Sequence, residues 1–133
     1  MEKLLALDVG ARRIGIATCD GAVRLAYALK TLEVDGNEMS ALKALLDHEK
    51  PAKLVVGFPR NQAGEATHQT KIVEEFAHRL ETLGVPIVFQ DESLTSVLAE
   101  QFLEKQGKPY SKDMIDSQAA ALILQDYLEA NYG

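Results

Sequence analysis

Hydrophobic residues form runs whose spacing predicts strands first and helices afterwards. An apolar run at residues 3–10 predicts a strand buried on both faces, and residues 13–19 and 25–32 predict two more strands. Asp20 and Gly21 follow the second of these runs and are typical of a tight hairpin turn. Three successive strands predict an antiparallel meander, whereas in a dinucleotide-binding unit a helix would follow the first strand.

The rest of the chain alternates between helical and strand patterns. Apolar residues at helical spacing predict helices at residues 37–50 and 67–84, the second capped by Thr67 and ended by Gly84. Apolar runs at residues 53–58 and 86–90 predict strands, a helix then runs to residue 105, and a last helix covers residues 113–132. This order predicts an α/β fold with a five-stranded mixed sheet, an antiparallel three-strand meander plus parallel strands, flanked by helices.

Carboxylates occur where two of the predicted strands end. Asp8 interrupts the first apolar run, and an ionised carboxylate in a buried strand needs a structural partner or a cation. The alternative is that Asp8 only turns the chain, since Asp-x-Gly is common at strand ends. Asp91 and Glu92 directly follow the fifth strand, and the alternative for both is a loop before a helix capped by Ser93 or Thr95.

A third acid, Asp116, lies on the apolar face of the last helix. It precedes Ala119 and Ala120 by one turn, so we expect its side chain to point toward the sheet, which the small alanines would let the helix approach. The alternative is that Asp113 caps this helix and Asp116, as the third helical residue, only stabilises the helix dipole. Gly15 within a strand marks the close approach of another backbone or of a ligand, and the alternative is a packing glycine beneath a helix.

Length and composition limit how many domains the chain can form and which functions it can have. Its 133 residues suffice for one domain, residues 1–133, and 47% of them are hydrophobic, as in ordinary globular proteins. The net charge of −6 argues against a protein that coats nucleic acid without specificity. Neither a signal peptide nor an apolar stretch of membrane-spanning length occurs, so we expect a cytoplasmic protein. The single cysteine, Cys19, excludes an internal disulfide.

Several segments, taken together and in chain order, resemble the YqgF/RuvX family. They are residues 7–10 (LDVG) with 13–15 (RIG), 55–59 (VVGFP) with Gly64, 91–96 (DESLTS) and 112–120 (KDMIDSQAA). Asp113 is an additional acid that the family pattern does not require. The resemblance implies a ribonuclease H-like fold, a relationship to Holliday junction resolvases, and nuclease activity in maturation of the bacterial 16S ribosomal RNA precursor.

The same resemblance implies a catalytic site with two metal ions. Two divalent ions about 4 Å apart would activate water and stabilise the leaving oxygen, and hard oxygen ligands suit Mg²⁺ or Mn²⁺. We expect Asp8 to bridge the ions, Glu92 to bind one of them and Asp116 the other. Asp91 is the reserve for Glu92, because adjacent strand residues point in opposite directions and the sequence does not reveal the register.

Nucleic acid is the expected partner. The candidates for phosphate contacts are Arg12, Arg13, Arg60 and Lys112. We expect RNA in preference to DNA, ribosomal precursor particles as the context, no membrane partner, and either a monomer or a homodimer.

Three other functions stay open from the sequence. A sugar-kinase or actin-like ATPase also begins with Asp-x-Gly on a strand, but it needs a second lobe that 133 residues cannot supply. A noncatalytic nucleic-acid-binding module would share the fold, although acids at all three sites argue against it. A four-way-junction resolvase is the nearest competitor, and it would act as a homodimer to cut symmetric strands.

Overall fold

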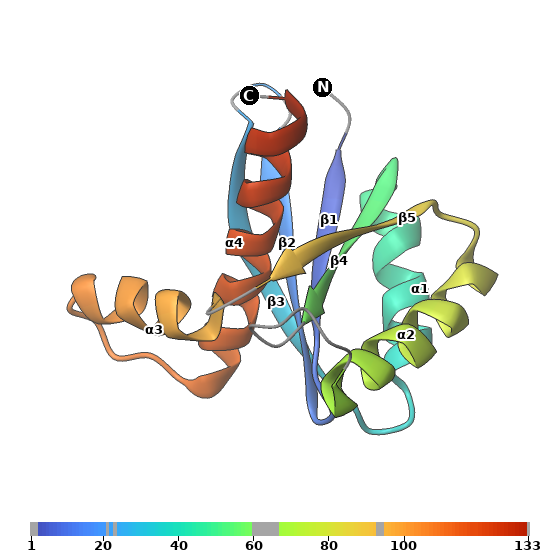
Figure 1. Ribbon diagram of the computed structural model, residues 1–133, viewed down its shortest axis with the longest axis horizontal. Helices are drawn as coiled ribbons and strands as arrows, with labels where there is room; N and C mark the ends of the chain where they lie inside the picture. Colours follow the sequence, from blue (N-terminus) through green and yellow to red (C-terminus); the bar gives the residue numbers. More distant parts are fainter. Residues whose placement is uncertain (1–2, 21, 23, 60–66, 93–94, 133) are drawn as a thin grey trace.

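A five-stranded mixed sheet organises the computed structural model of the protein, which describes residues 3–20, 22, 24–59, 67–92 and 95–132 (Figure 1). The strands are β1 (Leu4–Val9), β2 (Arg13–Asp20), β3 (Leu25–Glu33), β4 (Lys53–Pro59) and β5 (Ile87–Glu92). The helices are α1 (Glu38–Glu49), α2 (His68–Leu80), the short 3-10 helix η1 (Glu81–Leu83), α3 (Thr95–Lys105) and α4 (Lys112–Tyr132). The predicted α/β fold is confirmed.

The strand that contains Asp8 lies at the centre of the sheet. The strand order is β3-β2-β1-β4-β5, so β1 has two strands on either side. It pairs antiparallel with β2 and parallel with β4, and β4 in turn pairs parallel with β5. β2 and β3 pair antiparallel, with Asp20 opposite Leu25, which confirms the predicted hairpin although Gly21 lies outside the described residues. The meander plus parallel strands is therefore the observed topology.

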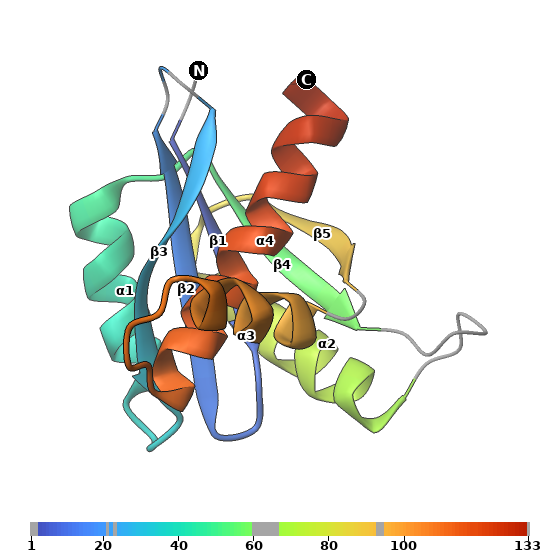
Figure 2. The same cartoon turned by 90° about the vertical axis from the view of Figure 1, so that its left-hand side faces the viewer.

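Side chains alternate between the two faces of β1 and build two separate cores. Leu5, Leu7 and Val9 belong to the core on the side of α1 and α2, whereas Leu4 and Ala6 belong to the core beneath α4. Figures 1 and 2 show α4 crossing one face of the sheet, with α1 and α2 on the other and α3 extending away from the sheet. By alternation, Asp8 shares the α4 face with Ala6.

Several element ends differ from the prediction. The fifth strand continues through Glu92, whose backbone pairs with Pro59 of β4. The two acids at positions 91 and 92 are therefore part of β5 and not of a loop. α4 begins at Lys112, and the Ser111 carbonyl accepts from the backbone nitrogens of Met114 and Ile115, so the idea of Asp113 as N-cap is wrong. Asp116 is consequently the fifth residue of α4 and not the third, which takes it beyond the first turn where the helix dipole acts most strongly.

The predicted cap of the second helix is confirmed. The Thr67 hydroxyl accepts a hydrogen bond from the backbone nitrogen of Thr70 at 3.2 Å, and the Thr70 hydroxyl accepts one from the backbone nitrogen of Thr67 at 3.0 Å. The helix itself ends at Leu80, and the last turn before Gly84 tightens into η1. Within the described ranges, no helix has both the length and the apolar character needed to cross a membrane.

Candidate active site

Asp8 projects from the central strand into the layer beneath α4. Its backbone pairs with Gly15 of β2, and the strand continues to Val9, so Asp8 does not turn the chain. On the other side, Gly57 follows Val56, the partner of Leu7, so no side chain fills the neighbouring position on β4. The half-buried carboxylate therefore borders a part of the sheet with small or absent side chains.

The helix α4 comes unusually close to the sheet above Gly15. A Cβ atom added at Gly15 would lie 2.0 Å from the Asp116 carbonyl oxygen and 2.8 Å from the Ser117 backbone nitrogen. Glycine is thus required for this approach, which confirms packing beneath a helix as the role of Gly15. Because Asp8 is the strand partner of Gly15, the same approach brings Asp116 toward Asp8.

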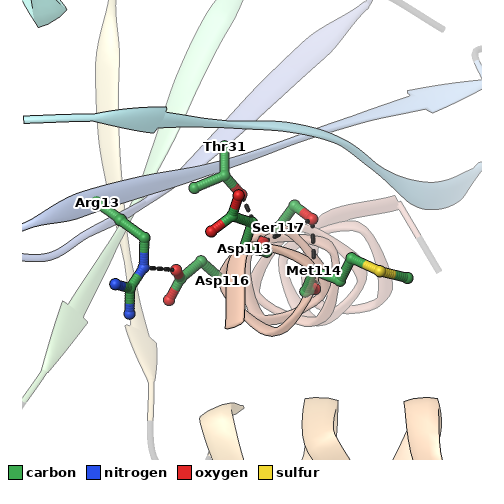
Figure 3. Close-up of polar contacts among 6 residues, drawn as sticks. All are labelled: Arg13, Thr31, Asp113, Met114, Asp116 and Ser117. Atoms are coloured by element: carbon green, nitrogen blue, oxygen red, sulfur yellow. Dashed lines mark hydrogen bonds and ion pairs between the residues drawn. The ribbon is translucent and has the colours of Figure 1, made fainter. Parts of the chain in front are cut away.

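A hydrogen bond holds the first turn of α4 on the outer strand β3. The Thr31 hydroxyl on β3 donates to the Asp113 carbonyl at 2.6 Å, and Figure 3 shows this contact beside the acidic side chain of Asp116. Ser117 donates back to the carbonyls of Asp113 and Met114, at 3.4 Å and 3.3 Å. The start of α4 is therefore bound to β3 while Gly15 lets it rest on β2.

Asp116 forms an ion pair with Arg13, the first residue of β2. The Nε atom of Arg13 donates to Oδ2 of Asp116 at 2.5 Å (Figure 3). The two side chains are 29% and 23% exposed, so the pair is partly shielded from water. This contact with Asp116 raises the pKa of Arg13. Arg13, which was predicted to contact phosphate, is therefore paired with Asp116, which was predicted to bind a metal ion.

Among the residues that the structure describes, Asp8 has no comparable cationic partner. Burial first, and then the negative charge of Asp116, raise the pKa of Asp8 to about 6. Within the described part of the chain, no hydrogen-bond donor offsets this effect at the Asp8 carboxylate. Two acids on different elements therefore converge, and the second makes ionisation of the first more costly.

The register of β5 separates the two remaining acids. Ile87 packs with the core under α1 and α2, whereas Val88 packs with the core under α4. Asp91 has the same strand parity as Ile87 and pairs with Phe58, so it lies on the face opposite Asp8. The side chain of Glu92 lies outside the described residues, and among the described ones no three acids, histidines or cysteines form a metal-binding group.

Three of the predicted basic residues, Arg12, Arg13 and Lys112, are described, and they lie at the start of β2 or of α4. Arg12 is exposed, and its carbonyl accepts from the backbone nitrogen of Val34 at 2.9 Å. Lys112 is exposed at the first position of α4. Arg60 lies outside the described residues, together with the loop predicted around it. Only Arg13 among the described candidates contacts one of the acids directly.

Sequence reasoning missed the ion pair between Arg13 and Asp116. The two residues are 103 positions apart, and neither the charge pattern nor the periodicity of the chain links them. Gly15 was the available signal, because a glycine inside a strand indicates close approach by another element. It identified the place of contact without identifying which helix residue makes it.

The oxygen atoms of Asp8 and Asp116 are chemically suited to a hard divalent cation. Mg²⁺ and Mn²⁺ prefer carboxylate oxygens over nitrogen or sulfur. A cation would also relieve the repulsion that raises the pKa of Asp8. The donor set therefore fits the expected metal, with two carboxylates converging in the described structure.

Known proteins with related sequences carry nuclease names. A protein of Crocosphaera subtropica named "Putative pre-16S rRNA nuclease" is 42% identical over 136 residues, covering 97% of this chain and 95% of that protein. A protein of Chloroflexus aurantiacus with the same name is 42% identical over 132 residues, covering 96% of this chain and 86% of that protein. Both relationships extend over nearly the full length of the two sequences.

Solved structures share the fold at low sequence identity. Thermus thermophilus RuvC in complex with a Holliday junction substrate superposes with a TM-score of 0.64 at 15% identity, covering 100% of this chain and 98% of that one. The Fowlpox virus resolvase in complex with Holliday junction DNA gives 0.57 at 11% identity, covering 98% and 99%. These similarities support the predicted ribonuclease H-like fold.

The family comparison covers almost every residue. The family described as "RuvX: Holliday junction resolvase" matches residues 2–130, which include Asp8, Asp116 and the segments that carried the resemblance. With this match and the relatives above 40% identity, the chain belongs to the RuvX family and is a nuclease.

Proposed function

We propose that the chain is a metal-dependent nuclease that hydrolyses phosphodiester bonds in the precursor of 16S ribosomal RNA. The names of its relatives support the substrate. The observation that carries the chemistry is the convergence of Asp8 and Asp116 at the centre of the sheet, where burial and mutual repulsion raise the pKa of Asp8 to about 6. Carboxylates with a strongly raised pKa are common in active sites.

Three acids make up the proposed metal site. Asp8 and Asp116 contribute from β1 and α4, and Glu92 contributes from the end of β5. Alternation from Val88 favours position 92 over Asp91, because Val88 belongs to the α4 core and position 92 has the same parity. When bound, Mg²⁺ or Mn²⁺ would polarise the phosphate and lower the pKa of an attacking water.

The protein's own side chains bind and orient the substrate in this proposal. Arg12, Arg60 and Lys112 contact the phosphate backbone, with Arg13 beside the acids. Asp8 and Asp116 repel the nucleic acid until their negative charge is compensated, so binding is modest and depends on salt. The protein works in the cytoplasm as one domain, on RNA in preference to DNA, as a monomer or homodimer on ribosomal precursor particles.

Resolution of four-way DNA junctions is the second candidate function. It is favoured by the description of the family and by the fold shared with resolvases whose structures contain Holliday junctions. A resolvase cuts two symmetric strands, so this function requires a homodimer. The noncatalytic alternative is not consistent with a nuclease family.

One assay tests both functions. We would incubate the protein with 16S precursor RNA and with a four-way DNA junction, in Mg²⁺, in Mn²⁺ and without metal. Asp8→Asn and Asp116→Asn should each reduce cleavage by at least about a hundredfold, the scale of losing one preorganised electrostatic contact. Lys43→Gln, at an exposed position of α1 on the opposite face of the sheet from α4, is the control. Full activity in Asp8→Asn would refute the site, and faster cleavage of the junction would favour the second function.

A further inference from the structure

Arg13 contacts Asp116 with only one edge of its guanidinium group. The Nε atom donates to Oδ2 of Asp116, while among the described residues neither Nη atom has a hydrogen-bond acceptor. Figure 3 shows the rest of the guanidinium group extending away from α4. Arg13 therefore holds the acid and keeps two donor groups available for another anion.

The surroundings of Arg13 are strongly acidic. Asp116 lies in contact with it, and Asp113 on α4 and Glu33 on β3 add weaker attraction. Glu33 is the strand partner of Arg13, so this arrangement is fixed by the register of the sheet. Without Arg13, the negative charge of Asp116 would face Asp8 with no other described cation in contact. Arg13 thus compensates the acid pair in the metal-free protein.

We propose that Arg13 is the resident counter-cation of the acid pair, which a divalent metal ion must displace from Asp116 in order to bind. The inference rests on the proposed function, because it concerns the same acids. A guanidinium group and a metal ion compete for the same carboxylate, and their positive charges repel each other. The displaced Arg13 can then bind a phosphate through its planar donors, so metal and nucleic acid favour each other's binding.

The direction of change in metal affinity distinguishes this role from a structural one. If Arg13 only orients Asp116, its loss should weaken metal binding by about tenfold or more, as is usual for groups that hold a ligand in place. If Arg13 competes with the metal, its loss should tighten binding. A partly exposed ion pair is worth up to about 1 kcal/mol, which corresponds to an increase in affinity of about fivefold.

Calorimetric titration with Mn²⁺ alone, at fixed ionic strength, tests the proposal without any nucleic acid. Arg13→Gln should bind Mn²⁺ about fivefold more tightly than the wild-type protein. Lys43→Gln is the control, because Lys43 is an exposed cation on α1, on the opposite face of the sheet from α4, and its Mn²⁺ affinity should not change. Equal or weaker binding by Arg13→Gln would overturn the proposal.

Two further variants keep the result decisive. Arg13→Lys retains a cation without the planar donor, so its Mn²⁺ affinity should lie between those of the wild-type protein and Arg13→Gln. If Arg13→Gln does not fold, Arg13→Lys takes its place in the test. For Arg13→Lys alone, affinity at or below the wild-type value overturns the proposal. Asp116→Asn should lose Mn²⁺ binding. If Asp116→Asn binds Mn²⁺ as tightly as the wild-type protein, the proposed metal site itself fails. If Asp116→Asn loses Mn²⁺ binding and the affinity of Arg13→Gln equals that of the wild-type protein, only the proposed role of Arg13 is refuted.

Discussion

The two faces of the sheet use side chains of different sizes and serve different purposes. The face under α1 and α2 is filled by large aliphatic residues such as Leu7 and Ile16, which have no exposed surface. On the face under α4, small residues surround the acids, namely Ala6, Gly15, Ala17 and Cys19 on the strands with Ala120 and Ala121 on the helix, and the larger side chains of this core come mainly from the later turns of α4. Large residues provide apolar burial, whereas small ones reduce the distance between helix and sheet.

The difference explains where the acids can meet. Asp8 and Leu7 are neighbours in β1, yet Leu7 enters a closed apolar core and Asp8 faces the approaching helix α4. The close contact at Gly15 brings Asp116 near Asp8 and within reach of Arg13. The face under α1 and α2 is therefore a closed apolar core, whereas the face under α4 combines apolar packing with the acids of a site. Four predictions test this division.

Leu7→Ala should have the largest effect on stability. The side chain is fully buried under α1 and α2, so its truncation should lower the free energy of unfolding by about 4 kcal/mol through lost burial and a cavity. Urea denaturation measures this loss, and Leu7→Met should cost less than about 1.5 kcal/mol. Cleavage per folded molecule should remain near the wild-type value. A large loss of activity in folded Leu7→Ala would contradict the division between the faces.

Asp8→Asn should stabilise the metal-free protein in a pH-dependent way. The folded-state pKa of Asp8, about 6, exceeds its ordinary value of 3.8, so folding favours the protonated acid. Below pH 3.8 the residue contributes no penalty, between 3.8 and 6 the penalty grows as pH rises, and above 6 it reaches its limit. The limit is about 3 kcal/mol from the size of the shift. Urea denaturation of both proteins from pH 4 to 7 measures the difference.

Asp116→Asn is the control for this experiment. Its substitution removes the ion pair with Arg13 as well as the repulsion from Asp8, so it should not give the stabilisation expected for Asp8→Asn. A difference between wild type and Asp8→Asn that does not vary with pH would show that the Asp8 pKa is not raised by its surroundings.

Gly15→Ala should damage the site and the fold together. The added Cβ atom would meet the Asp116 backbone, so α4 must move, at a cost of about 2 kcal/mol. We expect metal-dependent cleavage by the folded variant to fall by about tenfold, because a small displacement of a catalytic group is costly. Gly36→Ala is a suitable control, since Gly36 has a φ of 97° that also strains alanine, but it lies directly before α1 and an added Cβ atom there would meet nothing within 4 Å. Equal activity in the two variants would contradict the proposed role of the contact.

Metal should give the smallest change in stability. If Mg²⁺ binds only the folded protein with a dissociation constant of about 1 mM, 10 mM should add about 1.4 kcal/mol to the free energy of unfolding. Thermal denaturation with and without Mg²⁺ measures this increment. It should disappear in Asp8→Asn and Asp116→Asn and persist in Leu7→Met. An increment of full size in all three variants would show that the two acids do not share a cation.

The elements of the fold were largely predictable from local patterns. The apolar run around Leu7 indicated the buried central strand, Thr67 indicated the start of α2, and Asp20 with Gly21 indicated the hairpin between β2 and β3. These signals are local, because burial on both faces, helix capping and tight turns each constrain residues that lie close together in the chain. Sequence alone also identified Asp8 and Asp116 as the acids to examine.

Element ends and side-chain directions were less predictable. The last helix begins at Lys112 and not at Asp113, since an acid near a helix start can occupy several positions with similar energy. Whether Asp91 or Glu92 shares a face with Asp8 depended on how far β5 continues and on its register with β4. A shift of one residue exchanges the two faces, and hydrogen bonding between strands decides it.

The sequence by itself therefore determined the order of the elements, the central position of Asp8 and the family resemblance. Only the tertiary structure decided that α4 rests on Gly15, that Arg13 holds Asp116, and that Asp91 lies on the opposite face from Asp8. The physical reason is the range of the interactions. Periodicity and capping act over a few residues, whereas close packing and charge pairing join residues that are remote in the chain and near in space.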